Sequence, residues 1–172
     1  MNIALFDFFY GFAHRGTGLD AAIIFIARDF VWVIIVGLFF YLLKNRDRHA
    51  AVRDLAIVFG AALVGIAVAA VLKNIFQTLR PFDAIKSVQS LITESGFAFP
   101  SGHTTLVASL AGALWSAHKR PAIFVGLAGI LVGASRVMAG VHWPVDILGG
   151  FLIGSIVGAV IYYLAHRLSF FQ

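Results

Sequence analysis

Long apolar stretches separated by short polar breaks form the main pattern of this chain. A helix that crosses a bilayer needs about 20 predominantly apolar residues. Five stretches come close to that length: residues 19–43, 55–71, about 104–117 with a start nearer Ser101, 122–139 and 145–165. Residues 2–13 are apolar and aromatic-rich but too short to span, which predicts an interfacial or re-entrant helix. The pattern therefore predicts an all-α fold, a polytopic transmembrane bundle of about five spanning helices plus this N-terminal helix.

The polar breaks carry many of the basic residues and so predict the orientation of the spans. Three of them are basic: Lys44, Arg46, Arg48 and Arg53; then His118, Lys119 and Arg120; then His166 and Arg167. Basic residues that flank membrane spans are enriched on the cytoplasmic side. With five spans, the N-terminus and the breaks at about 74–100 and 136–144 then face outward. We therefore expect an integral cell (inner) membrane protein whose outward breaks lie on the extracytoplasmic side.

Composition supports a membrane protein and disfavours several other classes. The 172 residues are 60% hydrophobic and 12% charged, with a mean hydropathy of +0.93, whereas soluble domains carry about 25% charged residues. The length suits one compact domain, residues 1–172. The net charge of +5 resides in the breaks, which argues against a nucleic-acid partner. Without cysteine we expect neither a disulfide framework nor a thiolate metal site, and without a cationic N-terminal region we expect no cleaved signal peptide.

Two features inside the apolar stretches have more than one explanation. Glycines recur at four-residue spacing, at Gly150, Gly154 and Gly158 and again at Gly129 and Gly133. Such spacing lets helix backbones approach closely, and packing within the chain is favoured over a dimer interface. Arg28 and Asp29 interrupt the first stretch, where ionisable groups are costly. A paired structural role is favoured for them, with a substrate-channel role as the alternative.

Three short segments at the outward breaks combine cations with a helix start. They are K-N-I-F-Q-T-L-R-P (73–81), P-S-G-H (100–103) and S-R-V-M-A-G-V-H-W-P-V-D (135–146). Lys73, Arg80 and Arg136 supply three fixed cations, and a guanidinium group binds phosphate oxygens bidentately. Ser101 is a good N-cap, Gly102 permits close backbone approach, and the free N–H groups of a helix N-terminus bind anions. Together these groups indicate a site for a phosphoryl group.

Two histidines and an aspartate supply groups for phosphoryl transfer. His142 and Asp146 are four residues apart, and Pro144 between them is favoured in the first turn of a helix. The Asp146 carboxylate can then accept a hydrogen bond from one imidazole nitrogen and leave the other free to attack phosphorus. His103 can protonate the departing oxygen and later deprotonate water, because an imidazole pKa near neutrality suits both steps. Taken singly, each residue also has an ordinary explanation as an anchor, a helix cap or a solvated group.

These segments resemble the signature of the type 2 phosphatidic acid phosphatase superfamily, which shares its site with vanadium-dependent haloperoxidases. The signature K-x6-R-P, P-S-G-H and S-R-x5-H-x3-D matches in full across residues 73–146. The resemblance implies a helical bundle and a metal-independent phosphatase that uses a phosphohistidine intermediate and no cofactor. It also implies the residue roles: His142 as nucleophile, Asp146 as its orienter, His103 as general acid and base, and Lys73, Arg80, Ser101, Gly102 and Arg136 as phosphate-binding residues.

The expected substrate depends on a narrower resemblance. Residues 8–20, F-F-Y-G-F-A-H-R-G-T-G-L-D, are similar to the start of bacitracin-resistance-type undecaprenyl pyrophosphate phosphatases, and so is the small size. Members of that group often have P-S-D-H where this chain has Gly102. We expect hydrolysis of undecaprenyl pyrophosphate to the monophosphate, with phosphatidylglycerolphosphate, phosphatidate or lipid A phosphate as alternative substrates. A haloperoxidase and a non-enzymatic lipid transporter are less favoured. Beyond the lipid substrate and membrane lipids no partner is expected, and an oligomer is not indicated.

Overall fold

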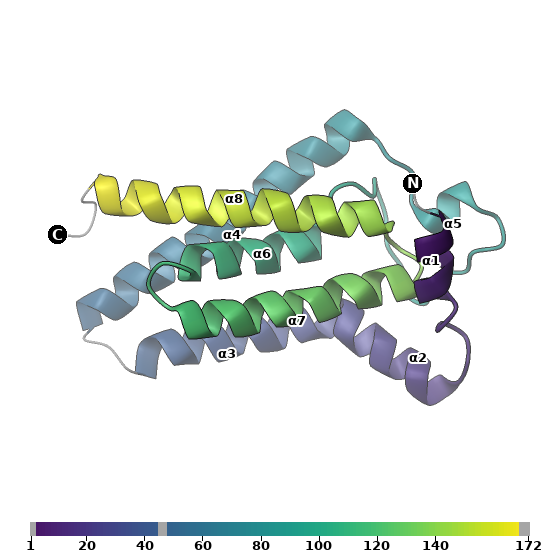
Figure 1. The fold of residues 1–172 in the computed structure, drawn as a ribbon, viewed down its shortest axis with the longest axis horizontal. Helices are drawn as coiled ribbons and strands as arrows, with labels where there is room; N and C mark the ends of the chain where they lie inside the picture. The colour runs from purple at the N-terminus through teal and green to yellow at the C-terminus, as the bar shows by residue number, and fades with distance from the viewer. Residues whose placement is uncertain (1–2, 45–47, 169–172) are drawn as a thin grey trace.

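The computed structural model describes residues 3–44 and 48–168, and these residues form helices and loops without a strand (Figure 1). The elements in chain order are α1 (Ile3–Tyr10), α2 (Thr17–Ile24), the π-helical turn η1 (Phe25–Asp29), α3 (Phe30–Lys44), α4 (Arg48–Phe76), α5 (Pro81–Ala84), α6 (Gly102–Leu114), α7 (Lys119–Met138) and α8 (Pro144–Arg167). Because α2, η1 and α3 follow one another without a break, they form one long helix with a π-helical turn inside it. The predicted all-α fold is confirmed.

Within the described residues, four helical segments are long and apolar enough to cross a membrane. They are Thr17–Lys44, Arg48–Ala84, Lys119–Met138 and Pro144–Arg167. The third predicted span forms as α6, but it has only 13 residues and rises about 20 Å, which is less than a bilayer core of roughly 30 Å. α6 is therefore shorter than the four long segments, although it connects the loops at the two ends of the bundle (Figure 1).

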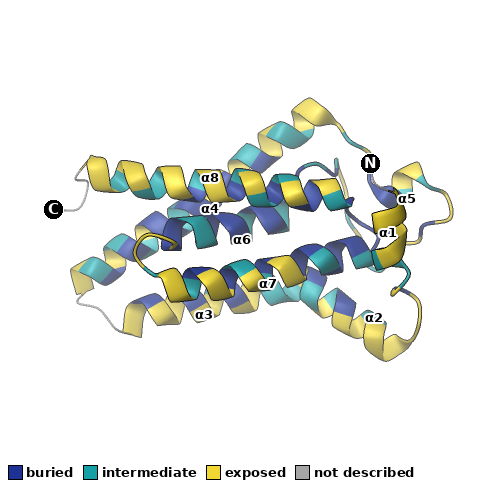
Figure 2. Cartoon of the chain, in the orientation of Figure 1, coloured by how far each residue is buried: buried dark blue, intermediate teal, exposed yellow. Residues whose placement is uncertain are grey.

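α6 is the core of the bundle. It contacts α4, α7 and α8, and eight of its 13 residues are buried. Buried positions of the longer helices face inward, while exposed positions lie on the outside (Figure 2). The outer surface is apolar: Trp32, Phe124 and Leu148 each expose more than 60% of their area. An apolar exterior around a small-residue core suits contact with lipid.

The regularly spaced glycines lie where α8 crosses α6. A Cβ at Gly150 would come within 2.9 Å of the Ser101 carbonyl oxygen, and one at Gly154 would overlap the Thr105 carbonyl oxygen. Gly158 is equally close to the Ser109 carbonyl. The spacing therefore serves packing inside this chain, as expected, and it draws the α6 backbone against α8.

The three polar breaks that carry basic residues lie at the same end of the bundle, where α3 and α8 end and where the α6–α7 loop is located (Figure 1). Arg46, one of the basic residues used for the topology prediction, lies outside the described residues. At this end the buried Asp54 carboxylate lies 2.9 Å from Nε2 of His118 and 3.2 Å from Nη2 of Arg53. This contact ties the start of α4 to the loop before α7.

The N-terminal helix lies across the opposite end of the bundle. α1 has eight residues and is about 12 Å long, so it is too short to span. Its fully buried Phe6 packs against Trp143 with 5.0 Å between ring centroids. The Tyr10 hydroxyl donates to the Gln89 carbonyl at 3.0 Å. The helix expected over residues 2–13 is therefore docked onto the loops at this end; Asn2 lies outside the described residues.

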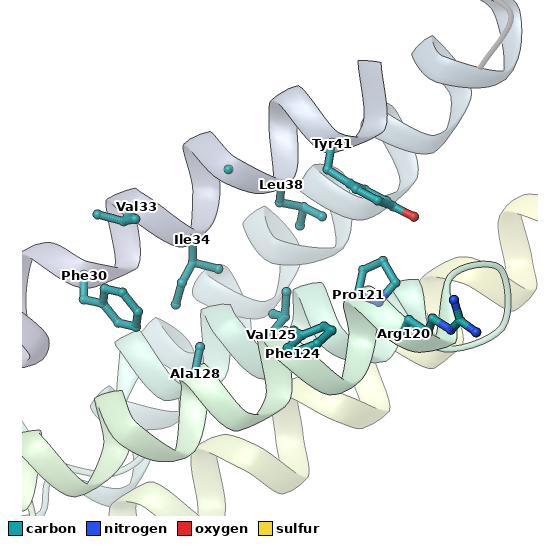
Figure 3. A pocket seen from close by; sticks show the side chains of 11 residues that line it. Phe30, Val33, Ile34, Leu38, Tyr41, Arg120, Pro121, Phe124, Val125 and Ala128 are labelled. Carbon is teal, nitrogen blue, oxygen red and sulfur yellow. The ribbon is translucent and has the colours of Figure 1, made fainter. Parts of the chain in front are cut away.

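An apolar groove of about 650 Å³ separates α3 from α7 (Figure 3). Phe30, Ile34 and Leu38 line one wall, and Val125 and Ala128 line the other. None of its lining residues belongs to the three motif segments. This hollow therefore lies apart from the candidate site.

Candidate active site

All eight residues singled out by the sequence lie at one end of the bundle, at or beside a helix end. Lys73 is in the last turn of α4 and Arg80 precedes α5; Ser101, Gly102 and His103 start α6; Arg136 is in the last turn of α7; and His142 and Asp146 flank the start of α8. This end is opposite the one that gathers the basic breaks (Figure 1). The antiparallel bundle thus collects three segments that are up to 73 residues apart in sequence.

The His142 ring is held between an acid and a guanidinium group. Its Nδ1 lies 3.2 Å from Oδ2 of Asp146, and its Nε2 lies 3.5 Å from Nη1 of Arg80. The same Asp146 oxygen accepts a 2.8 Å hydrogen bond from the Trp143 backbone N–H at the start of α8. Because the carboxylate can only accept, Nδ1 carries the proton and donates it, and Nε2 keeps its lone pair. Pro144 begins α8, as expected.

Both histidines of the site are neutral near pH 7. Burial, and then the positive charges of Arg136 and Arg80, lower the pKa of His142 well below its usual value of 6.5. Burial and Arg136 also lower the pKa of His103 to about 4. A neutral imidazole whose Nε2 carries no proton is the form that can act as a nucleophile.

Two of the three cations are held by the segment between α5 and α6, residues 85–100, which we call the strap. Lys73 donates to the carbonyl oxygens of Phe97 and Ala98, the latter at 3.1 Å. Arg80 donates from Nε to Gly96 at 2.9 Å and from Nη2 to Ser95 at 3.0 Å. Arg80 also reaches the Val141 carbonyl at 3.0 Å, one residue before His142. The strap therefore fixes the cations beside the imidazole.

The third cation is held by the π-helical turn. Arg136 is 1% exposed, and its Nη1 donates to the Ala27 carbonyl oxygen at 3.1 Å. A π-helical turn interrupts the regular ladder of helix hydrogen bonds, and such turns are frequent at functional sites. The adjacent Arg28 and Asp29 form an exposed ion pair at 2.9 Å, in agreement with the paired structural role. Nε of Arg136 is buried without a hydrogen-bond partner among the described residues.

The start of α6 faces the same cluster. Oγ of Ser101 caps the helix by accepting a hydrogen bond from the Thr104 N–H, and the Ser101 N–H donates to the Asp146 carbonyl at 3.0 Å. This second bond joins the N-termini of α6 and α8. A Cβ at Gly102 would meet no atom within 4 Å. The start of α6 therefore leaves open space beside Gly102.

The sequence motifs did not include Glu94, which lies in the strap. Its Oε1 forms a short ion pair with Nη2 of Arg136, and its Oε2 lies 3.5 Å from Nη2 of Arg80. The sequence showed an acid in the outward break, but it did not show that this acid pairs with Arg136 and Arg80, because that pairing depends on how the strap folds. Among the described residues, no three His, Cys, Asp or Glu side chains form a group that could hold a metal ion.

The arrangement defines an integral membrane protein with a cationic, histidine-containing cluster at one end of its helical bundle. The chain belongs to the PAP2 superfamily, whose sequence model matches residues 54–170. It is accordingly a membrane lipid phosphatase of that superfamily.

Known proteins resemble the chain over most of its length. The bacitracin transport permease protein BcrC of Bacillus licheniformis is 26% identical over 99% of this chain and 83% of its own length. The undecaprenyl-diphosphatase BcrC of Bacillus subtilis is 28% identical over 92% and 81%. The crystal structure of Aquifex aeolicus LpxE superposes with a TM-score of 0.73 at 26% identity, covering 94% of each chain. The resemblance to bacitracin-resistance-type phosphatases is thereby confirmed.

Proposed function

We propose that the chain, as one membrane-embedded domain, hydrolyses undecaprenyl pyrophosphate to undecaprenyl phosphate and inorganic phosphate. In this proposal His142 is the nucleophile and neither a metal ion nor a cofactor takes part. The observation that carries the proposal is the His142 ring, whose Nδ1 faces Asp146 while Nε2 faces Arg80. An orienting acid on one nitrogen and a phosphate-binding group beside the other is the geometry that nucleophilic attack on phosphorus requires.

The first step forms a phosphohistidine. Nε2 of His142 attacks the terminal phosphorus, the P–O bond to the lipid phosphate breaks, and His103 gives a proton to the departing oxygen. The pKa of His103 is about 4, lowered by burial and by Arg136. Negative charge on a bound phosphoryl group opposes that effect and raises the pKa of His103, which equips it to act as an acid.

The second step releases phosphate. His103 removes a proton from water, the resulting oxygen attacks phosphorus, and the N–P bond to His142 breaks. Lys73, Arg80 and Arg136, with the N-terminus of α6 at Ser101 and Gly102, stabilise charge on the phosphoryl oxygens. The Nε of Arg136, which has no hydrogen-bond partner among the described residues, supplies a donor for one of these oxygens.

The proposed lipid and the proposed membrane side have separate support. The Bacillus subtilis relative named undecaprenyl-diphosphatase supports the lipid, as does the N-terminal stretch of residues 8–20. The basic residues at the far end of the bundle support an extracytoplasmic site in the cell membrane. Phosphatidylglycerolphosphate, phosphatidate and lipid A phosphate are the alternative substrates, since the proposed site would recognise a phosphoryl group and not a lipid tail.

The proposal is tested with purified protein and a panel of these lipids, by measuring phosphate release. We expect the highest kcat/KM with undecaprenyl pyrophosphate and full activity in EDTA. The variant His142→Ala should lose activity on the order of a thousandfold or more. Unchanged turnover in that variant would exclude His142 as the nucleophile, and a faster monophosphate substrate would exclude the proposed lipid.

The Bacillus licheniformis relative is named a transport permease protein, so lipid transport is a second candidate function for this chain. Transport does not need a nucleophile or its orienter. Lipid movement that persists in His142→Ala liposomes, together with no phosphate release by the parent protein, would favour transport over hydrolysis.

A further inference from the structure

Glu94 joins the two arginines of the proposed phosphate site. Each of its carboxylate oxygens is directed to a different guanidinium group: Oε1 to Arg136 and Oε2 to Arg80. The two arginine side chains are 1% and 4% exposed, whereas that of Glu94 is 24% exposed. The carboxylate thus reaches in from the more open side of the cluster and bridges two buried cations.

The bridge has the chemistry of a bound phosphoryl group. A carboxylate offers two oxygens in a plane to guanidinium N–H donors, and a phosphoryl group offers the same kind of acceptors with more charge. Burial by itself would raise the pKa of Glu94, but Arg136 and then Arg80 outweigh it and hold that pKa below its usual 4.5. Glu94 is therefore an anion at neutral pH, and it uses the donors that a phosphate needs.

A buried guanidinium group without a counter-charge is costly. An acid that pairs with both arginines avoids that cost. The same acid repels a second anion, because two negative groups cannot both lie against the same pair of donors without strong repulsion. Occupation by Glu94 and occupation by phosphate are therefore mutually exclusive.

We propose that Glu94 is an exchangeable counter-anion of the phosphate site, which leaves Arg80 and Arg136 when a phosphoryl group binds and returns to them as phosphate departs. This inference depends on the proposed function for the identity of the phosphate-binding residues. Its consequence is kinetic: the carboxylate weakens the binding of the product and so speeds its release. A phosphoryl group displaces it because Lys73 and the N-terminus of α6 add donors that the carboxylate does not use.

The strap makes this exchange feasible. Glu94 and its neighbour Thr93 form no helix, and Thr93 is exposed. The strap is anchored on both sides of them, at Leu91, whose N–H donates to Ala139 at 3.0 Å, and at Gly96, which accepts from Arg80. The carboxylate can therefore swing away by side-chain rotation while the anchors stay in place.

The test measures inorganic phosphate binding, by calorimetry and by inhibition of turnover, for the parent, Glu94→Gln and a control. Glu94→Gln keeps the size of the side chain and removes its charge, so we expect at least about tenfold tighter phosphate binding. The control Asp83→Asn removes an exposed negative charge that acts on Arg80 only through space. It should change the phosphate affinity by less than about twofold.

Glu94→Asp provides a second variant if the glutamine protein does not fold. Its shorter side chain keeps the charge but cannot span both guanidinium groups, so its phosphate affinity should fall between those of the parent and Glu94→Gln. Phosphate binding that is unchanged or weaker in whichever of these variants folds would overturn the exchange. If the parent protein hydrolyses none of the lipids but the Glu94 variant still binds phosphate more tightly, the exchange stands and only the proposed hydrolysis is refuted. The two results can be separated because calorimetry does not depend on turnover.

Discussion

At the scale of single residues, His142 is defined by what its two ring nitrogens face. Nδ1 is fixed by Asp146 and Nε2 is directed toward Arg80. Oδ2 of Asp146 faces Nδ1 of His142 and also accepts a hydrogen bond from the Trp143 backbone N–H at the start of α8. The orientation of the imidazole is therefore tied to the start of a helix rather than to a flexible loop.

Asp146→Asn tests whether the carboxylate orients the imidazole. The asparagine oxygen can still accept the Trp143 N–H, so the helix start should remain. The charge that favours the Nδ1–H tautomer is lost, and we expect kcat on the preferred lipid to fall by about 10²–10⁴-fold. Thermal melting in detergent is the control and should change by only a few degrees. Activity within about threefold of the parent would contradict the orienting role.

The two histidines of the site also predict acid sensitivity of the fold. The pKa of His103 is about 4 in the folded protein and near 6.5 in an unfolded chain. Between these values the unfolded state binds more protons, so stability falls as the pH drops from 6.5 toward 4. The lowered pKa of His142 acts in the same direction.

Melting temperatures of the purified protein measured from pH 7 to 5 should therefore decline. His103→Gln should show a shallower decline, because one of the two groups no longer gains a proton on unfolding. His166→Gln, which changes an exposed histidine at the far end of the bundle, serves as control and should follow the parent. A decline as steep in His103→Gln as in the parent would refute this account.

At the scale of elements, the contact between α6 and α8 positions the site. Gly150, Gly154 and Gly158 let the two backbones approach, and the Ser101 N–H reaches the Asp146 carbonyl as a result. The helix that carries His103 and the helix that carries Asp146 are thereby joined at their N-termini. Any substitution that forces them apart separates the proposed acid from the proposed nucleophile.

Gly154→Ala is the test of that contact. Its Cβ would overlap the Thr105 carbonyl and come within 2.7 Å of the Ala108 Cβ. We expect a loss of stability of about 1–3 kcal/mol, the usual cost of overpacking, together with lower phosphatase activity. Gly126→Ala is the matched control, because a Cβ there meets no atom within 4 Å and alanine favours helix. Equal melting temperatures for the two variants would argue against a tight α6–α8 contact.

At the scale of the whole molecule, the bundle separates two ends of different chemistry. One end carries the His142 cluster, and the other carries the basic breaks and the Asp54–His118 pair. The apolar surface between them suits lipid. The proposed orientation, with the cluster on the extracytoplasmic side, makes a prediction that does not depend on catalysis.

Single cysteines test the orientation directly, since the chain has none of its own. Ser87 in the strap and Ser116 in the α6–α7 loop are both exposed and lie at opposite ends. In intact cells, a membrane-impermeant thiol reagent should label Ser87→Cys and not Ser116→Cys. Permeabilised cells are the control and should label both. The reverse pattern in intact cells would place the His142 cluster on the cytoplasmic side.

Sequence by itself determined the helical membrane class, the approximate limits of the long helices and the eight clustered residues. These follow from local properties, namely runs of apolar residues, helix-start signals and short motifs with fixed spacing. The distance between His142 and Asp146 was also predictable, because it depends on a single helix start at Pro144.

Only the tertiary structure decided the features that depend on contacts between distant segments. α6 packs against α4, α7 and α8 in the centre of the bundle, and an apolar run does not reveal which helix takes that position. Arg136 is held by a carbonyl of the π-helical turn 109 residues away. Glu94 bridges two arginines because the strap folds over them. Ion pairs between segments that are distant in sequence depend on how the tertiary fold brings those segments together. No local pattern along the sequence encodes that arrangement.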